Sequence, residues 1–193
     1  HKIASNYGKS YYPSDYSPNA GWADYYGNED FFKAYPNDDR KEWNYMTEWK
    51  IKSGEIIPYT ESADKLPAIS KYYDYDEGAP GKSAQSNGIT CIYRYAEVLL
   101  MYAEASTRAT NSVNQDALNA IQEVQKRAGY QNRQIELTTT TEPAAFLAAV
   151  SNERGWEFFA EMKRWFELVR MEKVKEVRAE EGDAATVHTS HHD

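Results

Sequence analysis

Three glutamates in the C-terminal part of the chain recur at four-residue spacing: Glu153, Glu157 and Glu161. On an α-helix this spacing places their carboxylates along one stripe. Two carboxyl groups roughly 5 to 9 Å apart can hydrolyse a glycosidic bond, provided that one of them carries a proton. Arg154 and Arg164 lie among these acids, and a neighbouring guanidinium keeps a carboxyl ionised, which removes the proton donor. We therefore interpret the acids as structural ion-pair partners and predict no catalytic residue.

The chain is also rich in aromatic side chains, with 16 tyrosines against 6 phenylalanines. A sugar has an apolar C–H face that stacks on an indole or phenol ring, while its hydroxyl groups bind polar side chains. Two segments offer such rings, the loop-like GWADYYGN and the alternating WNYMTEWKI. We predict a glycan-binding site among their six aromatic residues, Trp22, Tyr25, Tyr26, Trp43, Tyr45 and Trp49, with Trp22 as the first candidate. Packing in the core is the alternative, above all for the last three.

Two segments resemble parts of metal sites, but neither has a complete set of ligands. Asp74–Gly78 is similar to the start of a calcium loop and lacks the closing glutamate at the required spacing. His188, His191 and His192 lie in a tail without neighbours that could orient them. We predict no metal site and no cofactor.

Charge and cysteine content limit the classes of partner. The formal net charge is −8, which repels phosphate backbones, so we expect no nucleic-acid partner. Cys91 has no second cysteine to pair with, and we expect it to be buried. No stretch approaches the ~20 apolar residues of a membrane span, and the first residues lack the apolar core of a signal peptide. We expect the chain as given to be soluble.

The elements that position these side chains differ between two parts of the chain. Residues 1–90 hold 12 of the 16 tyrosines and six of the seven prolines, which indicates loops with short strands. We predict a short helix over Glu29–Tyr35 and a strand over Trp43–Ile51 that carries Trp43, Tyr45 and Trp49 on one face. A turn at 52–54 and a return strand over Glu55–Tyr59 would complete a β-hairpin.

Further segments set the expected domain limits. Ala68–Tyr75 is predicted to be extended, and residues 76–88 to be a flexible connector. Residues 179–193 have no apolar pattern and are predicted to be a flexible tail. We therefore predict a single domain over residues 1–178, made of this aromatic region and a helical core over residues 91–178.

From residue 92 onward the apolar spacing becomes that of a helix. One face of the first predicted helix carries Ile92, Tyr95, Ala96, Leu99, Tyr102 and Ala103. An ion pair is predicted between Arg94 and Glu97, at three-residue spacing. A second pair is predicted between Glu104 and Arg108, at four-residue spacing.

Two more helices are predicted to follow. The second opens at Asn114, ends at Gly129 and forms an antiparallel hairpin with the first. The third has Thr141 as a possible cap and is predicted to run on through Val177. Such a helix would be long, so we expect a break or bend at Gly155, because glycine is poor in a helix interior.

Three blocks of this helical part resemble, in order and spacing, the C-terminal half of the SusD/RagB family of bacterial surface nutrient-binding lipoproteins. They are RYAEVLLMYAEA from Arg94, ALNAIQEVQKRAG from Ala117, and a Glu/Arg-rich motif from Glu153 to Arg170. The upstream AYPNDDRK resembles the family's tyrosine and acidic-arginine segment. The charged positions of the third block, which we predict to form structural ion pairs, are Glu153, Arg154, Glu157, Glu161, Arg164 and Arg170.

The resemblance implies a mainly α fold, with a tetratricopeptide-like helical hairpin, a long C-terminal helix and a loop-rich segment that contains a short β-hairpin. It implies a non-catalytic protein, lipid-anchored on the outer membrane, that captures glycans and delivers them to a TonB-dependent, SusC-like transporter. Met162, Glu167 and Gln125 stand where the family usually has glycine, aspartate and arginine. Family members are much longer, so we expect this chain to be a fragment whose partners include the rest of the same polypeptide.

Two other functions stay open. A scaffold that binds segments of other proteins would fit the tetratricopeptide-like hairpin alone. A glycoside hydrolase would require acid–base chemistry by Glu157 or Glu161.

Overall fold

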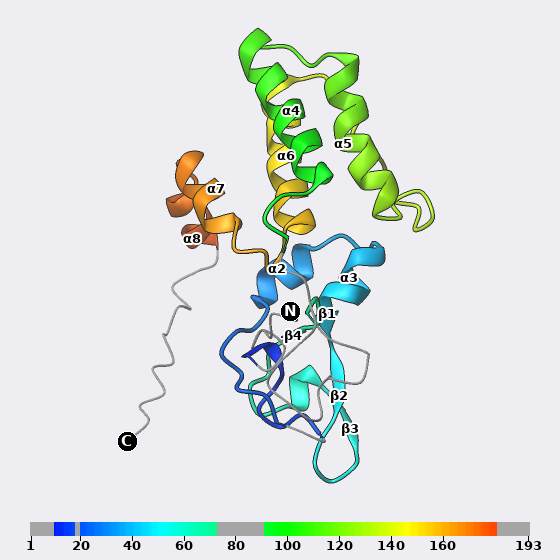
Figure 1. The fold of residues 1–193 in the computed structure, drawn as a ribbon, viewed down its shortest axis with the longest axis vertical. Helices are drawn as coiled ribbons and strands as arrows, with labels where there is room; N and C mark the ends of the chain where they lie inside the picture. The colour runs from blue at the N-terminus through cyan, green and yellow to red at the C-terminus, as the bar shows by residue number, and fades with distance from the viewer. Residues whose placement is uncertain (1–9, 18–19, 73–90, 181–193) are drawn as a thin grey trace, which may run out of the picture.

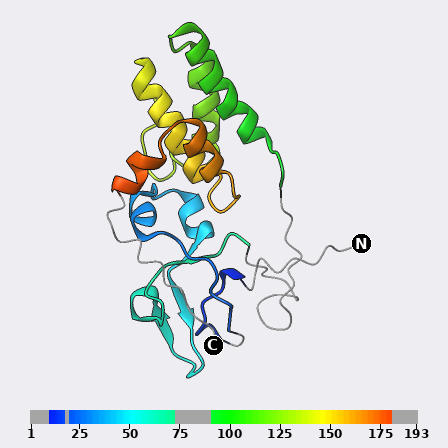
Figure 2. The same cartoon turned by 90° about the vertical axis from the view of Figure 1, so that its left-hand side faces the viewer.

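The computed structural model describes residues 10–17, 20–72 and 91–180. Three long helices stand side by side in its upper level (Figure 1): α4 (Tyr95–Thr110), α5 (Gln115–Arg127) and α6 (Pro143–Glu157). Short helices, loops and two small sheets form a lower level, and Figure 2 shows the same two levels from the side. The predicted mainly α fold is confirmed.

The core of the upper level is apolar and lies between these three helices. α4 and α5 form the predicted hairpin, and α6 packs against both. The buried residues of this core are Leu100, Ala103, Ala117, Leu118, Ala120, Ile121, Val124, Phe146, Val150 and Phe158. Alanines at several of these positions allow the helix backbones to approach closely.

α5 begins and ends where the sequence predicts. The side chain of Asn114 caps the first turn by accepting a hydrogen bond from the Ala117 amide at 2.8 Å. Gly129 follows the last turn with a φ of 85°, a left-handed conformation that costs little in the absence of a Cβ. Local residues thus define both ends of this helix.

α4 begins at Tyr95 rather than at Ile92, and its packed face agrees with the predicted one only at Ala96, Leu99 and Ala103. Leu100 and Ala103 are buried in the core, whereas Ile92, Tyr95 and Tyr102 are exposed. The prediction gave weight to the large side chains. The close approach of α5 and α6 instead selects the stripe that contains smaller residues.

The predicted long C-terminal helix is divided into three helices in the structure. α6 ends at Glu157, α7 spans Arg164–Arg170 and α8 spans Val174–Glu180. Between α6 and α7 the chain passes through Ala160 and Met162, whose φ angles of 58° and 60° are left-handed. A right-handed helix cannot continue through such residues.

Gly155 is not the break that the sequence predicts. It lies inside α6, where a Cβ would come within 3.2 Å of the guanidinium carbon of Arg164. The glycine therefore leaves room for Arg164, which donates to the Ser151 carbonyl oxygen at 2.9 Å. The predicted cap is also wrong by one residue, because the side chain of Glu142, and not that of Thr141, accepts the first-turn hydrogen bond.

The lower level contains two antiparallel two-stranded sheets. β2 (Glu48–Lys50) pairs with β3 (Ile56–Pro58) across a turn at Gly54, which confirms the predicted hairpin. β1 (Tyr45–Met46) pairs with β4 (Ala68–Ile69), which falls within the predicted extended run. The end of that run and the predicted connector lie outside the described residues.

Three short helical elements complete this level: α2 (Glu29–Ala34), α3 (Asp39–Asn44) and the 3-10 helix η1 (Tyr59–Glu61). α2 matches the predicted helix. Within the described part of the chain, no helix is both long and apolar enough to cross a membrane.

α3 corrects the predicted strand over residues 43–51. Trp43 belongs to the last turn of α3, so extended structure begins only at Tyr45. The cause is Asp38, whose carboxylate caps α3 by accepting a hydrogen bond from the Arg40 amide at 2.9 Å. Helix capping here overrides the alternating pattern of the rings.

Cys91 is exposed, contrary to the prediction that it is buried. It precedes α4 by a few residues, beside Ile92 and Tyr93, whose side chains are also exposed. The residues that follow Cys91 in the sequence therefore do not cover the thiol.

Gly129→Ala is expected to lower the free energy of unfolding by roughly 2 kcal/mol, because the left-handed φ is strained for alanine and its Cβ would collide with the Asp39 carboxylate. Gly54→Ala is the matched control, since Gly54 has a φ of 94° but a Cβ there would make only an ordinary contact, with Lys50 at 3.9 Å. The control substitution should lower the free energy of unfolding by about 1 kcal/mol. Urea unfolding measures both, and equal losses would contradict the Asp39 contact.

Candidate functional site

Glu157, the last residue of α6, is the centre of a buried network of ion pairs. Its Oε2 accepts hydrogen bonds from Arg40 at 2.8 Å and from Arg127 at 2.6 Å. Its Oε1 accepts from Arg127 at 2.5 Å and from Arg94. Burial would raise the pKa of this carboxyl, but Arg94, Arg127 and Arg40 outweigh burial and hold its pKa below the ordinary value. Glu157 is therefore ionised, and it joins α6 to α3, to α5 and to the start of α4.

Glu153 lies one turn earlier in α6 and is fully buried. Its carboxylate accepts hydrogen bonds from Arg40 at 2.7 Å, from Tyr130 at 3.1 Å and from Gln125 at 3.3 Å. Arg40 also donates to Asp38 at 2.6 Å, so one guanidinium serves several acids. Burial raises the pKa of Glu153, although Arg40 opposes this shift.

Glu161 follows the end of α6 and connects the two levels. It accepts hydrogen bonds from Arg94 at 2.7 Å and from Lys71, just after β4, at 2.6 Å. Burial would raise the pKa of Glu161, but Arg94 and Lys71 together hold its pKa below the ordinary value. Lys71 also donates to the Phe159 carbonyl oxygen at 2.9 Å, which fixes the turn between α6 and α7.

The three glutamates lie in ion pairs, but neither predicted partner, Arg154 or Arg164, supplies the cation. Arg154 and Arg164 pair with Glu167 of α7, at 2.9 and 3.4 Å, and not with the three glutamates. The glutamates take their cations from residues distant in the sequence. Arg40 belongs to the AYPNDDRK segment, whose resemblance to the family was noted without any pairing being predicted from it.

The predicted pairs within α4 had a mixed outcome. Glu104 and Arg108 pair at 2.8 Å as predicted, and Glu104 also binds Arg170 of α7 at 2.7 Å. The predicted pair between Arg94 and Glu97 does not form, because Arg94 precedes the first turn of α4 and turns toward Glu157. Glu97 pairs instead with Lys163.

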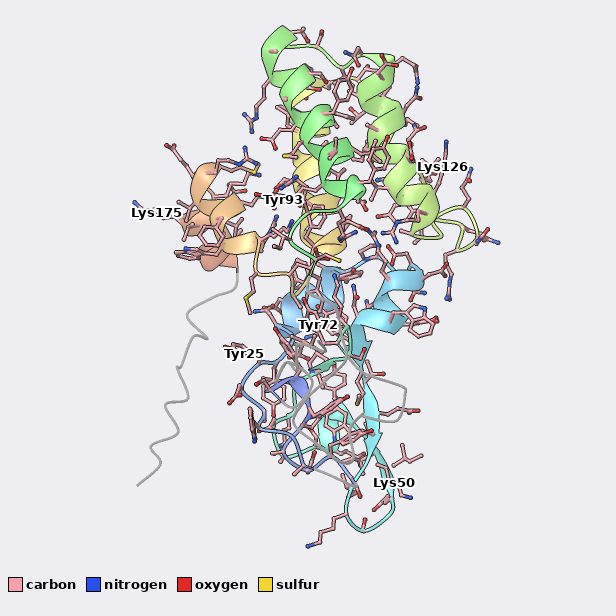
Figure 3. The ribbon with its side chains drawn as sticks, viewed as in Figure 1. Tyr25, Lys50, Tyr72, Tyr93, Lys126 and Lys175 are labelled. Carbon is pink, nitrogen blue, oxygen red and sulfur yellow. The ribbon has the colours of Figure 1, made fainter. Side chains whose placement is uncertain are left out.

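A cavity of about 450 Å³ lies at the junction of the two levels, where Figure 3 labels Tyr72. Its charged lining residues are Asp39, Arg40, Lys71, Arg94, Arg127, Glu157 and Glu161. Both oxygens of Glu157 and both of Glu161 already accept hydrogen bonds from cations. Neither acid is therefore available in this cavity as a proton donor.

The six predicted glycan-binding rings lie in three different environments. Trp22 and Tyr25, 48% and 52% exposed, lie in the loop before α2, together with the half-buried Tyr26. Tyr45 and Trp49 are buried, at 4% and 3% exposed, so a ligand cannot stack on them. The remaining ring, Trp43, is 64% exposed, but it lies on α3 and does not share a strand face with them.

The two buried rings hold the lower level together. Tyr45 packs against Phe159, with ring centroids 4.6 Å apart, and against Phe32 at 4.8 Å. The indole N–H of Trp49 donates to Asp15 at 2.7 Å. Core packing, the stated alternative for these two residues, is what the structure shows.

The loop that carries Trp22 and Tyr25 is fixed by backbone hydrogen bonds to residues 10–13. The amides of Asp24 and Tyr25 donate to the Ser10 carbonyl oxygen at 3.0 and 3.2 Å. The amide of Ala23 donates to the Tyr12 carbonyl oxygen at 3.1 Å. Behind the loop, the Tyr26 hydroxyl donates to Asp64. The exposed rings therefore sit on a backbone that is already ordered.

The exposed carboxylate of Asp24 lies between these two rings in the sequence. Figure 3 shows Tyr25 in the lower level, away from Tyr93 at the start of the helical level.

Among the residues that the structure describes, no three histidine, cysteine or acidic side chains come together as a metal site. The three tail histidines and Asp74–Gly78 lie outside those residues.

Comparisons with known proteins agree on one family. The model of the SusD family matches residues 7–192. SusD-like protein P2 of Formosa agariphila is 29% identical over 160 residues, which are 75% of this chain and 31% of that protein.

Solved structures show the same fold. A SusD homolog from Bacteroides thetaiotaomicron superposes with a TM-score of 0.71 at 20% identity, over 86% of this chain and 37% of that one. Surface glycan-binding protein A from Bacteroides uniformis gives a TM-score of 0.65 at 24% identity, over 89% of this chain and 36% of that one. The chain thus spans about a third of the length of these relatives.

Glu157→Gln is expected to lower the free energy of unfolding by about 3 kcal/mol, because a neutral amide leaves the buried Arg40, the partly buried Arg94 and the more exposed Arg127 without their shared counter-charge. Glu123→Gln on the exposed side of α5 is the control and should change it by about 0.5 kcal/mol or less. Urea unfolding gives both values. A similar small effect for the two variants would show that the network does not stabilise the fold.

Stability is expected to fall in acid. The folded-state pKa values of Glu157, Glu161 and Glu104 are depressed, so their contribution is complete above their unfolded pKa of about 4.3 and is lost as the pH falls through the lower folded values. Glu153, whose pKa is raised, has the opposite sign and offsets part of the loss. Urea midpoints at pH 7, 5 and 3.5 measure the effect, which should shrink in Glu157→Gln.

Proposed function

This chain belongs to the SusD family, and on that premise we propose that the protein binds glycans at the bacterial cell surface without cleaving them. The fold it shares with surface glycan-binding protein A supports the proposal. Because the chain spans about a third of its relatives, the proposal concerns the complete protein. The observation that supports it most is that the clustered glutamates are paired with arginine and lysine side chains, whereas exposed aromatic rings lie in the loop before α2.

The state of the three glutamates supports binding without catalysis. A glycosidase needs one protonated carboxyl group and one that can reach the sugar. Glu157 and Glu161 line the cavity but are held ionised by arginine and lysine. Burial raises the pKa of Glu153, but its carboxyl is enclosed and does not line the cavity. No member of the set thus combines a proton with access to substrate.

The loop before α2 is the proposed binding surface, with Trp22 and Tyr25 as stacking platforms. Their rings are about half exposed, and the backbone beneath them is fixed by hydrogen bonds to Ser10 and Tyr12. A prearranged ring loses little conformational entropy on binding. The Asp24 carboxylate beside them can accept hydrogen bonds from sugar hydroxyl groups.

Delivery to a TonB-dependent transporter and a lipid anchor in the outer membrane are the finer parts of the proposal. Membership of the SusD family is their support. Affinity purification of the complete protein from membranes of its own cells would test the transporter. Recovery without any TonB-dependent barrel would count against that part alone.

The protein-binding scaffold remains the second candidate. The helical hairpin of α4 and α5 supports it, because stacked hairpins of this kind commonly bind protein segments. Its test is retention of unrelated peptides in place of glycans.

Trp22→Ala combined with Tyr25→Ala is expected to weaken glycan binding by the complete protein at least roughly tenfold, since each stacked ring contributes on the order of 1 kcal/mol. Affinity electrophoresis through gels that contain a panel of polysaccharides measures the retardation. Trp43→Ala is the matched control, an exposed indole on α3, and should retain binding. Unchanged retardation of the double variant would refute this loop as the site. Absence of retardation of the unmodified protein on every polysaccharide would refute the function.

No reducing sugar is expected to be released from any polysaccharide that the protein binds, because Glu157 and Glu161 cannot supply a proton. A reducing-end assay over long incubation measures this. Release that disappears in Glu161→Gln would establish the glycoside hydrolase instead.

A further inference from the structure

A second cavity, of about 250 Å³, lies where α2, α6, α7 and α8 meet. Figure 2 shows α8 (red) beside α2 (blue) in this region. The cavity shares no lining residue with the larger one at Glu157. Its polar lining residues are Asn28, Asp30, Asn152 and Arg164, and its apolar ones are Phe31, Ala34, Trp156 and Val177.

Arg164 of α7 is held in a fixed position at the wall of this cavity. Its Nη1 donates to the Ser151 carbonyl oxygen at 2.9 Å and to Glu167 at 3.4 Å. The guanidinium lies over Gly155, where a Cβ would come within 3.2 Å of it. Glycine is unfavourable inside a helix, but here it leaves the space that Arg164 needs. Among the described residues, Nε and Nη2 of Arg164 have no hydrogen-bond acceptor.

Other polar groups of the cavity are also unused. Asp30 and Asn152 are exposed, and their side chains make no hydrogen bond within the part of the chain that the structure describes. In the same part of the chain, the indole N–H of Trp156 has no acceptor. A carboxylate accepts hydrogen bonds, a guanidinium donates them and an amide does both. The cavity therefore offers both acceptors and donors to a ligand.

Two aromatic rings give the cavity an apolar wall. Phe31 stacks on Phe159, with ring centroids 5.9 Å apart, and meets Tyr35 edge to face at the same separation. Trp156 lies 6.4 Å from the Tyr35 ring, and both wall rings are partly buried. Because neighbouring rings already fix them, Phe31 and Trp156 lose little freedom when a ligand packs on them.

This set of groups matches the chemistry of a sugar. The C–H face of a sugar packs on aromatic rings, while its hydroxyl groups can donate to Asp30, accept from Arg164 and do either with Asn152. An apolar ligand would leave these groups without partners, which weakens binding. The charges of Asp30 and Arg164 compensate each other, so the lining gives no net attraction to a uronic acid or a sulfated sugar.

We propose that this cavity binds one uncharged sugar residue of a glycan. The proposal rests on the proposed function and adds to it a second binding position and a class of sugar. The cavity is smaller than the ~300 to 1,000 Å³ typical of pockets for drug-sized ligands, which suits a single sugar residue. Asn28 lies three residues after Tyr25, so their Cα atoms are at most about 11 Å apart. The cavity therefore begins close to the proposed binding loop.

Asp30→Ala combined with Asn152→Ala tests the cavity in the complete protein. Affinity electrophoresis is run through gels that contain neutral polysaccharides (xylan, mannan, galactan, amylopectin) or anionic ones (alginate, carrageenan). At least one neutral polysaccharide should retard the unmodified protein. The double variant should bind that polysaccharide at least roughly tenfold more weakly, because it lacks two hydrogen-bonding groups. Both positions are exposed, so its Tm should stay within about 2 °C of the unmodified value.

Asp116→Ala combined with Asn119→Ala is the matched control, because these residues are exposed in the first turn and the interior of α5. The control should be retarded as strongly as the unmodified protein.

Three results would overturn the proposal in different ways. Equal retardation of the Asp30→Ala/Asn152→Ala variant and the unmodified protein by a neutral polysaccharide would exclude the cavity and leave the proposed function intact. Retardation by the anionic polysaccharides alone would exclude an uncharged sugar. No retardation of the unmodified protein by any gel would refute glycan binding itself, and this proposal with it.

Discussion

The fold depends on one buried carboxylate, that of Glu157, and on the three guanidinium groups that share it. Arg40 comes from α3, Arg94 from the start of α4 and Arg127 from the end of α5. Removing a charge from water is costly, and such a group is stabilised only where its partners are all in place. The network therefore favours the one arrangement in which the short helices of the lower level meet the ends of the three long helices.

The same ion pairs also determine the protonation state of the clustered glutamates. The clustered glutamates Glu153, Glu157 and Glu161 form ion pairs that hold elements together, and the pKa values of Glu157 and Glu161 are depressed as a result. Large apolar side chains are exposed elsewhere, among them Trp22 and Tyr25 in the loop before α2.

Features set by neighbouring residues could be predicted from the sequence. The limits of α5 follow from Asn114 and Gly129, and the β-hairpin follows from its central turn. Features set by distant residues could not. Arg94 has a nearby acid, Glu97, yet it pairs with Glu157, 63 residues later in the chain. Of the six candidate rings, the structure buries Tyr45 and Trp49. Their partners are distant in the sequence, Phe159 for Tyr45 and Asp15 for Trp49. The assignment of residues 1–178 to one domain stays a prediction.

A double-mutant cycle between Glu157 and Arg94 tests the central claim most directly. Unfolding free energies are measured in urea for the unmodified protein, Glu157→Gln, Arg94→Gln and the double variant. If the shared carboxylate holds the elements together, the two substitutions will be non-additive, with a coupling energy of roughly 1–3 kcal/mol. Losses that add to within about 0.5 kcal/mol would contradict it, since they would mean that the two side chains stabilise the fold independently.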